Sequence, residues 1–404
     1  MNRIIEFIDS LKEDVLYLQK NLVSIPALSP ENGGDGEEKK ADFLLNFLRK
    51  RGFPNIKVFS AKDERVSSKK RPNIVSLIEG KESSKTLWIV SHLDIVPPGD
   101  LELWDTDPYK LVVKGDLLYG RGVEDNHHGL VASLLCAHAY LKCKVLPKYN
   151  MGLIFVSDEE TGSKYGLDFL LKEHRDIFSS DDEFLVPDFG APDSTMIEVA
   201  EKCMLWLKVT VEGKQCHAST PHKGINSLVG AARLIVKVRD LYKEFAQKNK
   251  LFDPPISTFE PTKKEENVPN VNTIPGKDVF YIDCRILPEV EVDDVLKKLD
   301  EFKKKIEEDM KVKIKYEVIH KEPSSFTSLD CYLVKKLKEA IKTIYKKDAF
   351  PKGIGGGTVA AFPRRYGYPA VAWATLFETA HQPNEHTSIK NIINDAKVMS
   401  LLFV

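Results

Sequence analysis

Four short segments contain residue types that bind metal ions or move protons. In the first, Ser91-His92-Leu93-Asp94, the imidazole and the carboxylate stand two residues apart at the end of an extended segment, so their side chains point to the same side. A carboxylate beside an imidazole can fix its tautomer and orient it towards a metal. Because His-x-Asp is common by chance, this segment alone does not identify a site.

The other three segments add carboxylates and a second imidazole. In 120–126, Asp125 precedes a predicted helix and is either a metal ligand or the cap of that helix. The acidic run 158–160 follows a buried apolar segment. Its three carboxylates would repel one another unless a cation lies among them or water solvates them. His386 supplies an imidazole just before the last predicted helix.

The elements that must position these segments alternate between strands and helices. Apolar runs of strand length occur at 73–78, 86–90, 151–156 and 369–374, and helices are expected at 3–22, 37–51, 127–142, 163–172, 329–346 and 387–401. This order predicts an α/β fold with a mixed, mostly parallel sheet flanked by helices. In such sheets ligands bind beyond the carboxyl ends of the strands, which is where the polar segments fall.

Together, the four segments favour a pair of divalent cations. Imidazoles and shared carboxylates without a thiolate suit two zinc ions, and cobalt and manganese also suit such ligands. Two ions bridged by one carboxylate would lower the pKa of a water between them. A free glutamate would then take the proton of that water.

The pattern changes between residues 203 and 318. Strands are expected at 204–211, 256–260, 279–287 and 311–319, and helices at 224–241 and 291–309. The resulting order β-α-β-β-α-β predicts an α+β, ferredoxin-like unit. We therefore expect a catalytic domain made of residues 1–202 and 319–404, with an inserted domain at 203–318.

The composition is that of an ordinary globular protein of 404 residues. The 59 Lys and Arg residues balance 60 Asp and Glu residues, leaving a formal net charge of −1, so nucleic acid and anionic membranes are not expected as partners. No apolar run reaches the roughly 18–20 residues that span a bilayer, and the chain shows no signal-peptide core, which predicts a cytoplasmic protein. Six cysteines without a CxxC pair predict reduced, packed thiols, with a reactive Cys216 as the alternative.

The motifs resemble those of the co-catalytic metallohydrolases that include acetylornithine deacetylase, succinyl-diaminopimelate desuccinylase, aminoacylase, glutamate carboxypeptidase and carnosine-type dipeptidases. The resemblance spans essentially the whole chain, through SHLDIVPPGD, GRGVEDN, DEETGS, HASTP, DCRILP, GGGT and NEH in this order. It implies a two-metal hydrolase that cleaves the amide bond of an N-acyl amino acid or small peptide next to a free carboxylate. It also implies a homodimer in which the inserted domain acts as lid and dimerisation domain.

The resemblance assigns the metal ligands residue by residue. It implies that Asp125 bridges the two ions, and that its peptide bond to Asn126 is cis. The resemblance also implies a further carboxylate ligand about 25–30 residues after Glu159, which is the implied general base. Asp188 matches this spacing better than Asp193. The implied ligand set is His92, Asp125, Glu160, Asp188 and His386.

Further roles follow from the same resemblance. Glu159 resembles the general base that takes a proton from water and later protonates the leaving amine, and Asp94 resembles the carboxylate that orients His92. His217 of HASTP resembles a residue that reaches the partner's active site and stabilises the oxyanion. The implied residues for the substrate carboxylate are Asn272, Arg285 and the glycine-rich turn with Gly355, Gly356, Gly357 and Thr358.

Two departures and two alternative functions remain open. Asn126-His127-His128 stand where most relatives have Met-Lys, which leaves His127 without an explanation. Asp188 stands where many deacylases have Glu, which favours the peptidase-like branches.

A di-metal aminopeptidase would share the chemistry, although such enzymes generally lack the inserted domain. The alternative from another class is a non-catalytic amino-acid or peptide binder on the same fold.

Overall fold

The computed structural model describes residues 2–404, which divide into two compact units. The first unit contains the chain up to Val199, Thr327–Lys352 and Thr358–Val404, and the second contains Ala200–Phe326 and Gly353–Gly357. The second unit thus includes the glycine-rich segment, which we had expected in the catalytic domain. Because the division separates Gly357 from Thr358, the expected anion-binding turn is split between the units.

The first unit is built on a mixed sheet with the strand order β1-β2-β6-β3-β7-β17-β8. The central strands β6, β3, β7 and β17 run parallel to one another, whereas β1, β2 and β8 pair in antiparallel fashion at the two sides. This confirms the mixed, mostly parallel sheet. The strands are β1 (Lys57–Lys62), β2 (Lys70–Ile78), β3 (Glu82–His92), β6 (Tyr149–Val156), β7 (Glu183–Gly190), β8 (Met196–Glu201), β16 (Phe350–Ile354) and β17 (Ala370–Ala374), with a small separate sheet of β4 (Val112–Lys114), β5 (Leu117–Tyr119) and β18 (His386–Ser388).

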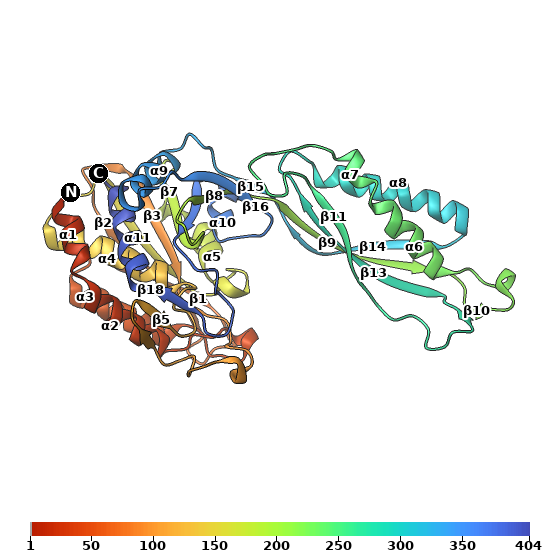
Figure 1. Cartoon of the computed structure of the whole chain (residues 1–404), viewed down its shortest axis with the longest axis horizontal. Helices are drawn as coiled ribbons and strands as arrows, with labels where there is room; N and C mark the ends of the chain where they lie inside the picture. The colour runs from red at the N-terminus through yellow and green to blue at the C-terminus, as the bar shows by residue number, and fades with distance from the viewer. Residues whose placement is uncertain (1) are drawn as a thin grey trace. The chain divides into compact units, whose positions relative to one another are not determined.

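Helices cover both faces of this sheet (Figure 1). On one face α4 packs against β3 and β7 and also contacts α1, α2 and α11. On the other face α5 and α10 pack together over Trp88 and Val90 of β3. The helices are α1 (Asn2–Asp9), α2 (Lys12–Val23), α3 (Glu38–Arg51), α4 (His127–Cys143), α5 (Leu167–Glu173), α9 (Tyr332–Tyr345), α10 (Ala361–Arg365) and α11 (Ile389–Leu401).

Burial on both faces explains why the central strands read as nearly unbroken apolar runs. Successive side chains of a strand point to opposite faces. In β3, the side chains from Leu87 to Val90 are at most 2% exposed, so both faces of this strand lie in the core. A strand that is covered on both sides needs apolar residues at every position.

Two local features differ from the expected elements. The helix expected at 3–22 is two helices, because the Ser10 hydroxyl and amide both donate to the Phe7 carbonyl (2.7 and 3.0 Å) and close α1 there. Strand β7 is not among the strands expected from the sequence, and it contains Pro187, which has no N–H for a sheet ladder. The ladder of β7 with β3 uses only residues 183–185, so Pro187 lies beyond it.

The second unit has the order β9-α6-α7-β11-β13-α8-β14 and a fully antiparallel sheet β11-β13-β9-β14 (Figure 1). This is the β-α-β-β-α-β arrangement of a ferredoxin-like fold. Helix α6 packs against β9, β11 and β13 and against α8. The elements are β9 (Cys203–Glu212), β10 (Cys216–His217), α6 (Ser227–Val238), α7 (Leu241–Glu244), β11 (Thr258–Lys264), β12 (Thr273–Ile274), β13 (Lys277–Ile286), α8 (Val292–Met310), β14 (Lys313–Glu322) and β15 (Ser325–Phe326).

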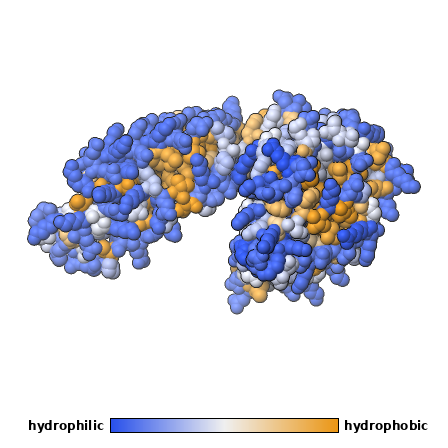
Figure 2. All heavy atoms as spheres, turned by 180° about the vertical axis from the view of Figure 1, so that it is seen from behind, coloured by the Kyte–Doolittle hydropathy of each residue, from blue (hydrophilic) through white to orange (hydrophobic). Residues whose placement is uncertain are grey.

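The surface agrees with the composition. Figure 2 shows a face that is mostly hydrophilic, with hydrophobic side chains between the charged ones. Within residues 2–404, no helix is both long enough and apolar enough to cross a bilayer. None of the six cysteines forms a disulfide bond and four of them are buried, as expected for packed thiols.

Candidate metal centre

The polar segments of the first unit meet at the carboxyl ends of the four parallel strands. His92 is the last residue of β3, Glu159 and Glu160 follow β6, and Asp188 lies near the end of β7. His381 lies in the loop that follows β17. Parallel strands end at one edge of a sheet, which brings side chains from distant parts of the chain together.

Asp125, just before α4, lies between two imidazoles. Its Oδ1 is 2.9 Å from Nε2 of His92, and its Oδ2 is 3.0 Å from Nε2 of His381. Glu160 Oε2 lies 3.1 Å from the same His381 nitrogen, and Asp188 Oδ1 lies 3.5 Å from Nε2 of His92. Each oxygen of the Asp125 carboxylate therefore lies beside a different imidazole nitrogen.

The donor set fits two divalent cations. Ligand atoms of His92, Asp125 and Glu160 lie within 4.8 Å of one another, and so do those of His92, Glu159 and Asp188. Glu160 Oε1 is buried and has no hydrogen-bond partner among residues 2–404. A buried carboxylate oxygen that no hydrogen-bond donor reaches is available to bind a cation.

The pKa shifts of the cluster point the same way. Burial raises the pKa of Glu159 and Asp188, and burial together with the Asp125 charge raises the pKa of Glu160 to about 7. Hydrogen bonds to Asp125 and Glu160 raise the pKa of His381 to about 10. Bound cations would favour the deprotonated form of these ligands.

The structure brings His381, and not His386, into this cluster. His386 is the first residue of β18, and its ring packs between Tyr119 and Phe377 with centroid distances of 5.1 and 5.3 Å. Its Nδ1 bonds to the Asn384 carbonyl (3.0 Å). The sequence-based assignment of His386 is corrected to His381, because strand pairing with β5 holds His386 away from the acids.

Asp188 and not Asp193 takes part in the cluster. Asn126 Nδ2 donates to Asp188 Oδ1 (2.6 Å) and so ties β7 to the residue after Asp125. Asp193 lies in a turn, where it accepts hydrogen bonds from the amide and hydroxyl of Thr195. The peptide bond between Asp125 and Asn126 is cis, as expected.

The Asp94 carboxylate holds the loop that carries Glu159 and Glu160. The carboxylate is buried and accepts hydrogen bonds from the amides of Glu159 and Glu160 (3.1 and 3.0 Å). The Nδ1 atom of His92 bonds instead to the backbone carbonyl of Asp94 (2.9 Å), while the carboxylate is 3.6 Å away. Asp94 therefore orients His92 through its main chain, which differs from the expected contact.

A buried ionic network that the sequence did not indicate supports the same loop from behind. The guanidinium of Arg71 pairs with both oxygens of Glu37 (2.7 and 2.5 Å) and with Asp158 (3.3 Å). Glu37 also accepts a hydrogen bond from the Asp158 amide (3.3 Å). All three side chains are at most 2% exposed, so the network fixes the residue immediately before Glu159.

The two histidines after Asn126 lie outside the donor cluster. His127 Nε2 bonds to Nζ of buried Lys40 (2.9 Å), and burial lowers the pKa of Lys40 to about 7. His128 bonds to Thr387 (2.7 Å) and to Asp395 (2.8 Å), which fastens the start of α4 to α11.

The expected substrate residues of the second unit lie at two ends of its sheet. His217 of β10 pairs with Thr273 of β12, so it lies beside Asn272, whose carbonyl accepts from Ala218. Arg285 lies near the other end of β13, opposite Met204 of β9. Between the Met204 and Glu212 positions the strand is roughly 27 Å long.

Arg285 is engaged by its own unit. Its Nε and Nη2 donate to both oxygens of Asp283 (2.8 and 3.0 Å), and its Nη1 donates to the Gly355 carbonyl (2.7 Å). Gly355 thus presents its carbonyl oxygen, and not its amide, to Arg285. In the first unit, Thr358 accepts from the Ala360 amide (3.2 Å).

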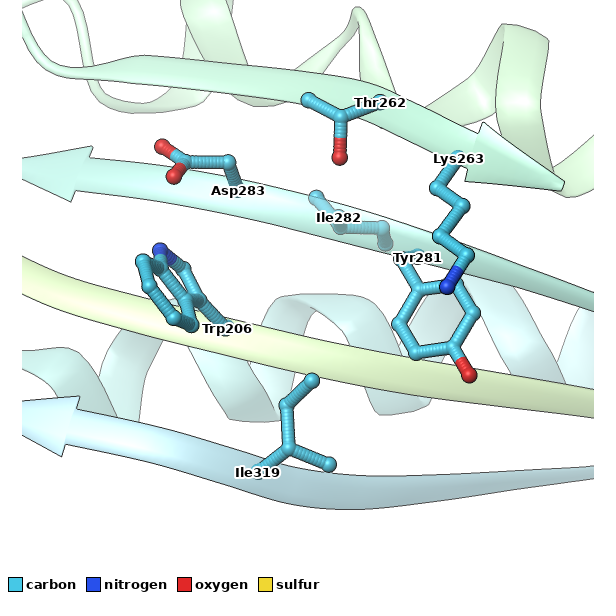
Figure 3. Close-up of a pocket in the computed structure, with 7 residues that line it drawn as sticks. All are labelled: Trp206, Thr262, Lys263, Tyr281, Ile282, Asp283 and Ile319. Atoms are coloured by element: carbon cyan, nitrogen blue, oxygen red, sulfur yellow. The ribbon is translucent and has the colours of Figure 1, made fainter. Parts of the chain in front are cut away.

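A hollow of about 370 Å³ lies on the sheet of the second unit (Figure 3). Trp206 and Ile319 border it from neighbouring strands, and Tyr281 and Asp283 come from β13. The hollow has one carboxylate and no imidazole, so its lining is not a metal-binding set.

Known proteins share both the sequence and the fold. Residues 88–403 match the model of Peptidase family M20/M25/M40. The chain is 42% identical to an uncharacterized metallohydrolase of Methanocaldococcus jannaschii, over 96% of this chain and 98% of that protein. It is 25% identical to the succinyl-diaminopimelate desuccinylase of Wolbachia pipientis wMel, over 95% and 90% of the two chains. The structure of aminopeptidase PepT from Bacillus cereus matches with a TM-score of 0.78 at 18% identity, over 97% of this chain and 98% of that one. The chain therefore belongs to Peptidase family M20/M25/M40, and it is a metal-dependent hydrolase.

Proposed function

We propose that the protein is a two-metal hydrolase that cleaves the amide bond of an N-acyl amino acid or small peptide next to a free carboxylate. The observation that carries this proposal is Asp125, whose two oxygens each meet a different imidazole, His92 and His381. Glu160 and Asp188 complete the proposed ligand set, one near each imidazole. Zinc is the proposed metal, with cobalt and manganese as alternatives.

The metals would supply Lewis acidity that polarises the scissile carbonyl and acidifies water. Glu159 is the proposed proton carrier. Its Oε2 lies 4.0 Å from Nε2 of His92, so it reaches the same space as the ligands, and its side chain is 18% exposed. It would accept a proton from the attacking water and donate it to the leaving nitrogen. The Asp94 carboxylate holds the Glu159 amide and keeps the side chain in place.

Arg285, the 355–358 turn and Asn272 are the proposed partners of the substrate carboxylate. Because Asn272 lies beside His217, at the end of the sheet opposite Arg285, it would contact a substrate bound by the partner subunit. A guanidinium matches a carboxylate through two parallel hydrogen bonds. Because Asp283 occupies Nε and Nη2 of Arg285, a substrate carboxylate would compete with Asp283 for this fork.

A panel of substrates tests the proposed reaction. We expect zinc-, cobalt- or manganese-loaded protein to hydrolyse N-acyl amino acids or dipeptides with a free carboxylate. Amidation of that carboxylate should lower kcat/KM roughly ten- to a hundredfold, because it removes charge-assisted hydrogen bonds. Tight binding without hydrolysis, measured by calorimetry, would instead support a non-catalytic binder.

The same panel addresses the aminopeptidase alternative. The aminopeptidase of Bacillus cereus covers the insert region of this chain, so the inserted unit does not argue against that activity. Faster cleavage of amidated peptides with a free amine than of N-acylated amino acids would favour an aminopeptidase and contradict our proposal.

We also propose a homodimer formed through the second unit, in which His217 serves the partner's site. The separation of His217 from Arg285 by the length of β9 supports this, because one unit cannot place both on one small substrate. Exposed apolar side chains of α6 offer contact area, with Leu228, Val229 and Val236 exposed by 39, 44 and 70%.

Mixed dimers test this arrangement. His217→Ala and Glu159→Ala proteins should each be inactive, while co-expressed chains should regain up to about a quarter of wild-type activity. Half of the dimers are then hybrids, and two-fold symmetry leaves each hybrid with one intact site. Hybrids that are shown to form but remain inactive would argue against the cross-subunit role of His217.

A further inference from the structure

Two buried carboxylates cross-link the loop that ends at Asp125 with the loop that contains His381. We propose that these residues, Glu385 and Glu124, are positioning residues that hold Asp125 and His381 in the geometry needed for two metal ions. This inference rests on the proposed two-metal site. Each carboxylate comes from one loop and binds main-chain amides of the other, so the two contacts form a reciprocal clasp.

Glu385 binds the Asp125 loop. Its Oε1 accepts hydrogen bonds from the amides of Glu124 and Asp125 (2.9 and 3.0 Å). Its Oε2 accepts from the Gly122 amide (3.0 Å) and from Nη1 of Arg121 (2.6 Å). The side chain is fully buried, so water does not compete for these four bonds.

Glu124 binds the His381 loop in return. It accepts hydrogen bonds from the amides of Phe377 and Thr379, and its Oε2 also accepts from the Thr379 hydroxyl. The Thr379 hydroxyl oxygen accepts in turn from the His386 amide (3.1 Å), which closes the loop around His381. Glu124 is 1% exposed.

The position of these bonds links the clasp to the ligands. Glu385 holds the amide of Asp125 itself, and Thr379 lies two residues before His381. Asp125 and His381 are 3.0 Å apart and come from segments separated by more than 250 residues of sequence. A small shift of either loop would therefore misalign the two ligands, and such supporting contacts typically contribute 10–100-fold to metal affinity.

Glu385→Gln tests the clasp. The glutamine side chain keeps the shape of Glu385 but replaces one carboxylate oxygen with an NH₂ group. The donors that this oxygen bound then lose their acceptor. We expect the dissociation constant of the more weakly held metal ion, measured with a chromophoric chelator, to rise about 10–100-fold. The visible absorption of the cobalt-loaded protein should also change, because ligand geometry determines it.

Glu198→Gln is the matched control. Glu198 is also buried in the first unit and is bound by both Nη atoms of Arg364 (2.8 and 2.7 Å), but it lies outside the clasp. We expect this variant to lower the melting temperature with metal affinity changed by less than about twofold. A Glu385→Gln protein that loses melting temperature to a similar extent and keeps wild-type metal affinity and spectrum would overturn the proposal.

A gentler variant keeps the proposal testable if Glu385→Gln does not fold. Thr379→Val preserves side-chain shape and removes only the hydroxyl that bonds to Glu124, and it should weaken the same ion several-fold. Unchanged affinity in Thr379→Val and in Glu124→Gln would contradict the clasp. Wild-type protein that binds fewer than two ions would instead contradict the proposed two-metal function, so the two failures are distinguishable.

Discussion

Glu159→Gln is expected to lower kcat by roughly 10²–10⁴-fold, while the fold and both metal ions are retained. Glutamine matches the shape of Glu159 but cannot accept the proton of the attacking water. The loop itself should not move, because the amides of Glu159 and Glu160 stay bound to Asp94. Turnover and metal content should be measured on the same preparation.

Glu64→Gln is a suitable control for the loss of a carboxylate, since Glu64 is 63% exposed and pairs with Lys62 at the surface. It should leave turnover unchanged. A Glu159→Gln protein that keeps more than about a tenth of wild-type activity would rule out Glu159 as the main base.

His381→Ala is expected to weaken one of the two ions by at least about 100-fold and to remove most of the activity. Loss of an outer supporting contact alone commonly costs 10–100-fold, and His381 is in direct contact with Asp125 and Glu160. The measurement is metal stoichiometry after dialysis against a weak chelator.

His386→Ala separates the two histidines of this loop. It should lower the melting temperature, because the ring packs between Tyr119 and Phe377, with aromatic contacts of this kind contributing about 0.5–1.5 kcal/mol. Two ions should remain bound. The reverse result, with metal lost from His386→Ala and kept by His381→Ala, would restore the assignment made from the sequence.

The central sheet could be predicted because its strands are apolar on both faces and alternate with helices. Strand β7 could not, since Pro187 and Asp188 interrupt its apolar pattern before the strand ends at Gly190. The break between α1 and α2 involves a hydrogen bond from the Ser10 hydroxyl to the Phe7 carbonyl. The periodicity of the apolar residues carries no information about such a contact, so the break could not be predicted from it.

The sequence could identify candidate donors that stand at the end of a buried strand or shortly after it, as His92 and Glu159 do. His381 could not be placed in this way, because it lies in an irregular loop. Positive φ angles at Glu378, His381 and Asn384 (64, 62 and 59°) turn that loop back towards the acids. The roles of Glu385 and Glu124 also depend on contacts between distant segments, and only the turn residues Pro383 and Asn384 hinted at a folded loop.

The ligands of the proposed metal site come from two stretches of the chain that the second unit separates. His92, Asp125, Glu160 and Asp188 all precede the second unit in the chain, whereas His381 follows it. A nascent chain that ends before β17 would therefore lack one imidazole of the proposed two-metal site. Binding of the second ion would thus require the two separate stretches of the first unit to be packed together. The binding free energy of that ion would then stabilise this packing.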